Sequence, residues 1–288
     1  MQLHQLSIMA LLSAGTLLPA AQLSAEKEWD CLINFERDAA GTPSGSTWNN
    51  ITNVTTPGSS INQSVSDTSG ATVGTLTTST LIATGAGPDW KPGASNLTSS
   101  NLFPSGITGP AGYETAAIQS FWNTNSYANP MTITITGLSA GWYSLDVLGA
   151  RNNGNLAGAM SLSASCDSIT YYSMGTTAGA ASGTWSAATT LTDATTVDPF
   201  GFIGGSHNGT NNGSAVYASF QGFYIEEGGS LTLTMYSSSS TENGGVANNN
   251  AALNYMVLSN YSVVPEPATA GRGLLGLAVL TLRRRRNS

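Results

Sequence analysis

The segment Met131-Thr-Ile-Thr-Ile-Thr-Gly-Leu-Ser-Ala-Gly-Trp-Tyr-Ser-Leu-Asp-Val147 alternates apolar and polar residues on both sides of a short, glycine-bounded turn. A period of two places the apolar side chains on one face of an extended strand and the polar ones on the other. The segment therefore predicts two β-strands, each with one buried face, joined by a turn at residues 137–141.

The same signal recurs along the chain. Residues 231–235 alternate in the same way, and apolar or β-branched runs predict further strands at 31–35, 76–82, 216–225 and 253–261. No helical period persists between residues 26 and 263, and Gly- and Asn-rich tracts separate the strands. We therefore expect an all-β fold over residues 26–263, a single antiparallel β-sandwich that is jelly-roll-like.

Composition excludes several classes of protein. Charged residues make up 9% of the 288 residues, and the formal net charge is −7; a typical soluble domain is about 25% charged. A coiled coil or helical bundle would be far richer in Glu, Lys and Arg. A nucleic-acid-binding surface would be basic, so we expect no nucleic-acid partner.

The N-terminus predicts export. An apolar run over residues 6–18 is followed by small residues up to Ala25. This order is typical of a signal peptide, here residues 1–25. Export would place the remaining chain in a compartment where disulfides can form.

The C-terminus carries a specific motif. Pro265, Glu266 and Pro267 precede an apolar stretch over 268–282, which is followed by four arginines, Arg283, Arg284, Arg285 and Arg286. In residue type, order and position, residues 264–288 resemble the PEP-CTERM sorting signal, which exosortase-type enzymes recognise in Gram-negative bacteria. The resemblance implies an exosortase partner, an inner-membrane intermediate, processing near the Pro-Glu-Pro, and delivery to the cell surface, outer membrane or extracellular matrix.

The tail's length agrees with a brief stay in the membrane. Fifteen residues span about 22 Å as a helix, whereas a comfortable crossing needs roughly 20 residues. We expect a short hydrophobic helix with transient membrane association, its arginines on the cytoplasmic side. Between Glu26 and Pro267, four basic and sixteen acidic residues leave a charge of −12, which repels anionic polymers.

Five short segments of the body share a pattern with a known class of module: Ile33-Asn-Phe35, Trp48-Asn-Asn50, Gly137-Leu-Ser-Ala-Gly-Trp-Tyr-Ser-Leu145, Gly149-Ala-Arg151 and Leu253-Asn-Tyr255. In these segments the body resembles exported galactose-binding-like β-sandwich modules, which bind glycans. The resemblance implies a β-sandwich associated with carbohydrate.

The residues do not predict catalysis. His207 is the one histidine after the signal peptide, and no G-x-S-x-G elbow or phosphate-binding loop occurs. Adjacent acids such as Glu226 and Glu227 should face opposite sides of a strand. We therefore expect no enzyme activity. A polysaccharide-degrading enzyme, which needs two converging carboxyls, ranks third among the functions considered.

Carbohydrate binding is the favoured function, and a structural matrix protein without a specific ligand is the alternative. Aromatic rings offer flat platforms for the C–H faces of sugars. Trp48 and Trp185 lie among small polar residues, so they are the predicted exposed platforms, with Asn208 as a hydrogen-bonding partner. Trp142 opens a strand after a turn and fits a core or a ligand-facing position.

Two further predictions concern metal and sulfur. Calcium would suit an acidic exported sandwich, with Asp30, Asp38 and Glu242 as candidate ligands. Cys31 and Cys166 lie near predicted strands, and they form either a disulfide or two buried free thiols.

Overall fold

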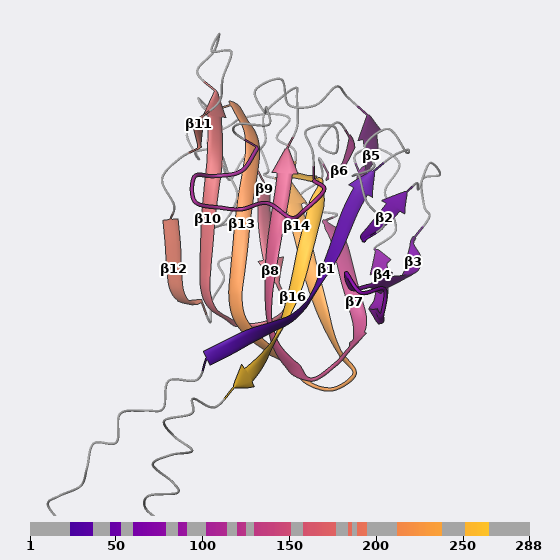
Figure 1. The fold of residues 1–288 in the computed structure, drawn as a ribbon. Helices are drawn as coiled ribbons and strands as arrows, with labels where there is room; N and C mark the ends of the chain where they lie inside the picture. The colour runs from indigo at the N-terminus through magenta and orange to yellow at the C-terminus, as the bar shows by residue number, and fades with distance from the viewer. Residues whose placement is uncertain are drawn as a thin grey trace, which may run out of the picture. The chain divides into compact units, whose positions relative to one another are not determined.

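The computed structural model describes residues 24–36, 47–52, 60–78, 86–90, 102–113, 120–124, 130–150, 158–176, 184–185, 189–194, 212–237 and 251–264. Every regular element in these ranges is a β-strand (Figure 1). The predicted sorting segment from Pro265, and the predicted signal peptide apart from Ser24 and Ala25, lie outside the described residues.

The chain divides into two units. One is Lys27–Tyr261, and the other combines Met1–Glu26 with Ser262–Ser288. In the second unit the described ends contact each other where Ser262 Oγ donates a hydrogen bond to Glu26 O at 3.4 Å. None of the described ranges contains a helix that is long and apolar enough to cross a membrane.

The described strands form two main sheets and a small ribbon. The larger sheet has the order β11 (Thr184–Trp185), β10 (Cys166–Thr176), β13 (Asn212–Ile225), β8 (Gly141–Ala150), β16 (Tyr255–Val264), β1 (Ser24–Glu36) and β2 (Trp48–Thr52), with β12 (Thr189–Ala194) also on β10. The smaller sheet has the order β3 (Asn62–Ser66), β4 (Thr72–Thr78), β7 (Met131–Leu138), β14 (Gly229–Ser237) and β9 (Gly158–Leu162). The ribbon joins β15 (Ala251–Leu253), β6 (Ser120–Thr124) and β5 (Ala86–Trp90).

The predicted all-β sandwich is confirmed. Strands β7, β8 and β14 cover the segments that alternate most clearly, and the chain passes from sheet to sheet at β7–β8 and β13–β14, as in jelly-roll folds. One edge departs from the antiparallel pattern, because β1 pairs with β2 in parallel, with Leu32 opposite Trp48. Alternation of side chains carries no information about strand direction, so the sequence could not reveal this pair.

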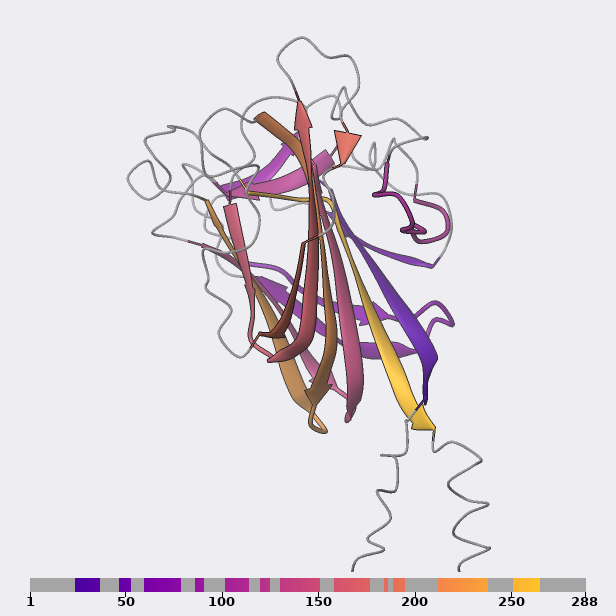
Figure 2. The same cartoon turned by 90° about the vertical axis from the view of Figure 1, so that its left-hand side faces the viewer.

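The core lies between the two sheets. Inward residues of the larger sheet such as Phe35 and Leu145 belong to one buried cluster with Ile133, Ile135 and Leu233 of the smaller sheet. Figure 2 shows the long strands of the larger sheet, including β1 and β16 side by side, as one layer with the second sheet beside it. Burial of these aliphatic and aromatic side chains supplies the main favourable term in folding.

A second buried cluster lies on the outer side of the larger sheet. Leu148, Tyr217 and Tyr255 belong to it with Tyr113 and Leu102 of the segment 102–113. The ring centroids of Tyr113 and Tyr255 are 4.5 Å apart. Since aromatic contacts add to area burial, this irregular segment is held against one half of the outer face.

Candidate functional site

Two large aromatic side chains stay exposed on the outer face of the larger sheet. Trp142 is 38% and Tyr224 47% exposed, whereas the other large apolar side chains whose burial is described are more covered. They lie opposite each other on β8 and β13. Their ring centroids are 5.5 Å apart with an interplanar angle of 66°. We refer to Trp142 and Tyr224 as the aromatic pair.

A bulge in β13 places Tyr224 beside Trp142. The register shifts between Gln221 and Phe223, so Phe223 turns into the core and Tyr224 turns outward. Gly222 occupies the bulge with φ +68°, in the left-handed region that favours glycine. Unbroken alternation would have put Tyr224 inward, so this glycine creates the pair.

Two connected turns support the strand ends beneath the pair. The β7–β8 turn and the β13–β14 turn both carry the chain between the sheets. Gly228 N donates to Leu138 O at 2.8 Å, and Ala140 N donates to Glu227 Oε2 at 2.9 Å. Because each turn bonds the other, the first residue of β8 and the last residue of β13 are fixed together.

Next to the pair, the outer face is polar. Gln221 Nε2 donates to Ser219 Oγ at 2.6 Å, and Ser219 Oγ donates to Asp146 Oδ1 at 2.5 Å. Across β16, Ser259 Oγ donates to Asp30 Oδ1 at 2.5 Å. Tyr261 lies opposite Trp142 and receives a hydrogen bond from Ser144 Oγ at 3.3 Å. We call this set the polar band: Gln221, Ser219, Asp146, Ser144, Ser259 and Asp30.

Asp146 is a half-buried acid at the centre of the band. Burial raises the pKa of its carboxyl, while hydrogen bonds from Ser219 and Tyr217 and the charge of Lys27 lower it in part. A carboxyl held in a row of hydroxyl and amide groups can accept hydrogen bonds from a polyol. Through its half-buried members Gln221, Ser219 and Asp146, the band therefore offers donors and acceptors directly beside two exposed rings.

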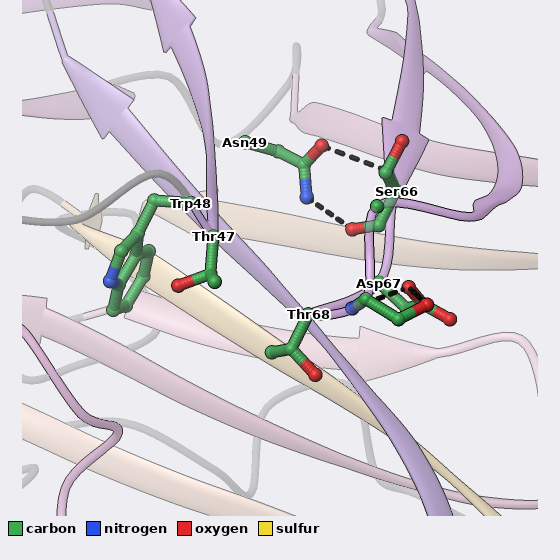
Figure 3. A pocket seen from close by; sticks show the side chains of 8 residues that line it. Thr47, Trp48, Asn49, Ser66, Asp67 and Thr68 are labelled. Carbon is green, nitrogen blue, oxygen red and sulfur yellow. Dashed lines mark hydrogen bonds between the residues drawn. The ribbon is translucent and has the colours of Figure 1, made fainter.

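A separate hollow of about 330 Å³ lies near the edge of the larger sheet. It is lined by Thr47, Trp48, Asn49, Ser66, Asp67, Thr68, Ser69 and Gly70 (Figure 3). Figure 3 shows the Trp48 ring on one side and Ser66 and Asp67 on the other.

Most polar groups of this hollow are already engaged in the fold. Asn49 Nδ2 donates to Ser66 O at 2.6 Å and to Leu32 O at 3.0 Å, and Ser66 N donates to Asn49 Oδ1 at 2.8 Å. Asp67 Oδ1 accepts hydrogen bonds from the backbone of Ser69 and Ala71. These contacts brace β2 against the β3–β4 turn, so we place the candidate site at the aromatic pair instead.

The prediction that Trp48 is an exposed platform is wrong. Trp48 is only 7% exposed, its Nε1 donates to Ala111 O at 3.2 Å, and its ring contacts Tyr113 at 5.1 Å between centroids. The polar neighbours of Trp48 in sequence gave no sign that the segment 102–113 covers it. This long-range contact is the physical reason for the error.

The other predicted ligand-binding residues are not brought together. Trp185, on β11, is half-buried and packs against the outer cluster. Asn208 lies outside the described residues, as do Pro265, Glu266, Pro267 and the four arginines Arg283, Arg284, Arg285 and Arg286.

The structure does not assemble the predicted calcium ligands among the residues it describes. Asp30 accepts the hydrogen bond from Ser259 and forms an ion pair with Lys27 at 3.2 Å. Asp38 and Glu242 lie outside the described ranges. Within those ranges, no three His, Cys, Asp or Glu side chains gather closely enough to hold a metal ion.

Cys31 and Cys166 are free and buried, so the structure has the thiol alternative rather than the disulfide. Both belong to the core between the sheets. Burial raises the pKa of each thiol to about 12, with nearby aspartates adding to the effect. Such thiols are poor nucleophiles near neutral pH.

Three of the segments that resemble galactose-binding-like modules meet in the fold. Asn34 Nδ2 donates to Asn50 Oδ1 at 3.3 Å, and Phe35 N donates to Asn254 O at 2.8 Å. Asn254 N in turn donates to Leu148 O at 2.8 Å. These asparagines are buried or half-buried and connect β1, β2 and β8. Their contacts therefore hold the strands of the fold together.

Comparisons with known proteins add little. No protein-family model matches the chain, and no curated protein matches it. One solved structure aligns with 81% of this chain and 86% of its own. Its description concerns the promiscuous specificity of carbohydrate-binding modules from the β-sandwich superfamily. Its sequence identity is 16% and its TM-score 0.11. The fold therefore rests on the strand pairing described above, and the ligand class rests on the site.

Proposed function

We propose that this chain is an exported cell-surface or matrix protein whose sandwich binds extracellular polysaccharide without cleaving it. The observation that carries the proposal is the exposed aromatic pair beside the polar band. The galactose-binding-like motifs of the body agree with it.

The geometry of the pair suits a sugar ring. Two rings inclined at 66° form an angled apolar surface, against which the C–H face of a pyranose can pack. Gln221 and Ser219 are half-buried on the same face of the sheet and can exchange hydrogen bonds with sugar hydroxyls. The charge of −12 between Glu26 and Pro267 favours a neutral polymer over an anionic one.

Export and sorting are proposed from the two ends of the sequence. The signal peptide over 1–25 would direct secretion, and the PEP-CTERM-like segment 264–288 would present the chain to an exosortase-type enzyme. The apolar stretch 268–282 would hold the protein in the inner membrane until it is processed. The polysaccharide-binding face would then act at the surface or matrix of a Gram-negative bacterium.

The hydrogen bonds made by the acids of this face support a non-catalytic role. Asp146 accepts the Ser219 hydroxyl, and Asp30 accepts the Ser259 hydroxyl while pairing with Lys27. Glycosidases need one carboxyl free to donate a proton and a second that attacks or activates water. Both acids of the band instead accept hydrogen bonds within the fold, which supports binding without cleavage.

The test is affinity electrophoresis of the full-length protein in gels containing neutral exopolysaccharides. We expect saturable retardation that weakens at least tenfold, or about 1.4 kcal/mol, on Trp142→Ala or Tyr224→Ala. Trp185→Ala is the matched aromatic control, because Trp185 packs on a different part of the outer face. Its affinity should stay unchanged.

Other outcomes would contradict the proposal. If no neutral polysaccharide retards the folded protein, the structural matrix role replaces binding. If Trp185→Ala weakens binding and Trp142→Ala does not, the site is elsewhere. Release of new reducing ends from the polymer would show that the protein is an enzyme.

A further inference from the structure

The outer face of the smaller sheet carries a regular grid of hydroxyl groups. Strands β4, β7 and β14 each contribute residues that alternate with buried Leu or Ile. The eight grid residues are partly or fully exposed. We call them the threonine array: Thr75, Thr77, Thr132, Thr134, Thr136, Ser230, Thr232 and Thr234.

Register places the array in rows that cross the three strands. Thr77, Thr134 and Thr232 lie opposite one another on the three strands. Thr75, Thr136 and Ser230 form the next row, and Thr132 with Thr234 forms the third. Neighbouring strands are about 4.8 Å apart, and alternate residues along a strand about 6.8 Å apart, so the hydroxyls repeat in two dimensions.

The array is held rigidly by the core beneath it. Ile133 and Ile135 lie between the threonines of β7, and Leu231 and Leu233 lie beside those of β14, all nearly fully buried. A β-branched side chain has few χ1 rotamers, which fixes methyl and hydroxyl directions. Thr134 Oγ1 and Thr232 Oγ1 are hydrogen-bonded at 2.9 Å, which ties adjacent strands at the centre of the grid.

The chemistry of the array narrows the choice of partner. Its eight side chains carry no charge, so they offer no charge attraction to an ionic partner, and they contain no ring on which a sugar could stack. The grid measures roughly 10 Å by 14 Å by the spacings above. A specific protein partner buries about 800 Å² on each side, several times this area.

We propose that the threonine array binds the surface of ice. The array is a rigid, neutral grid of hydroxyls and methyls that repeats in two dimensions. The surface of ice is also neutral, forms hydrogen bonds and repeats in two dimensions, so the two surfaces complement each other. A single hydroxyl bound to water gains little over bulk solvent. Fixed hydroxyls that engage one crystal face act together, because the first contact makes the others intramolecular. Thr77 Oγ1 and Thr136 Oγ1 donate to Thr134 O and Thr75 O at 3.4 Å, and their lone pairs remain acceptors for the ice surface.

The test compares the full-length protein with its variants in the same buffer. Buffer without protein is the blank. Ice is grown slowly from the solution, and the protein incorporated is compared with serum albumin added as a non-binding protein. We expect at least tenfold enrichment over albumin and slower ice recrystallisation. Thr134→Lys places a charged, flexible chain at the centre of the grid and should reduce enrichment to the albumin level.

A second variant guards against a folding defect. Thr136 is exposed, so a lysine at this position can extend into solvent, and Thr136→Lys should melt like the parent in circular dichroism while losing most of the ice enrichment. Trp142→Ala should keep the enrichment, because Trp142 lies on the other sheet. Enrichment that survives both lysine variants, or no enrichment of the folded parent protein, would overturn the proposal.

Polysaccharide binding provides an independent readout. The lysine variants leave the aromatic pair untouched, so their retardation in polysaccharide gels should equal that of the parent. Loss of ice binding with intact polysaccharide binding would show that the threonine array and the aromatic pair act independently. If either function fails, the other can still be tested.

Discussion

At the residue scale, Gly222 determines where Tyr224 points. Gly222→Ala forces a side chain into the left-handed region and sets its Cβ against the Asp167 carboxylate. We expect a loss of about 1–3 kcal/mol in the free energy of unfolding, together with weaker polysaccharide binding as Tyr224 moves. Urea titration and affinity electrophoresis of the same preparation measure the two effects.

Gly70 supplies the matched control. It has φ +91°, a Cβ added there would meet no atom within 4 Å, and it lies in the β3–β4 turn away from the pair. Gly70→Ala should lose stability through backbone strain and keep its affinity. Equal loss of affinity in both variants would mean that the binding defect reflects stability alone.

At the scale of elements, the β3–β4 turn depends on one carboxylate. Burial would raise the pKa of Asp67, but hydrogen bonds from Ser69, Ala71 and Gly70 prevail and lower it. The ionised form therefore stabilises the fold at and above the ordinary pKa near 4, and this contribution is lost as pH falls through the lowered pKa.

Asp67→Ala should cost about 2–3 kcal/mol at pH 7, because several donors lose a charged acceptor. The difference from the parent should shrink towards pH 3, as measured by urea unfolding at both pH values. Thr68→Ala, an exposed substitution in the same turn, should stay within about 0.5 kcal/mol at either pH. A cost that does not change with pH would rule out the charge as its source.

Also at this scale, strands are easier to predict than binding residues. Alternation locates β7, β8 and β14 because burial of one face leaves a local pattern. The parallel β1–β2 pair, the bulge at Gly222 and the cover over Trp48 depend on contacts between distant segments, which no local pattern records. The sequence around Trp142 fits either position, and the glycine two residues before Tyr224 is the one local sign of an irregular strand.

At the scale of the whole molecule, the two thiols report on the closed sandwich. With pKa values of about 12, Cys31 and Cys166 should react with a thiol reagent at pH 8 about a thousandfold more slowly than an unperturbed cysteine. In denaturant without reductant, two thiols per chain should react at once. If none reacts under those conditions, the protein contains a disulfide.

If the proposed sorting leaves the protein attached through its C-terminus, the register of β8 and β16 has a mechanical consequence. Trp142 on β8 lies opposite Tyr261 on β16, three residues before that strand ends at Val264. A polymer pulling on the aromatic pair and an anchor pulling on the tail would thus load two adjacent strands. The tension would pass through the short ladder of hydrogen bonds between β8 and β16 and largely bypass the rest of the sandwich. The strength of this ladder would therefore set the force at which the connection between polymer and anchor fails.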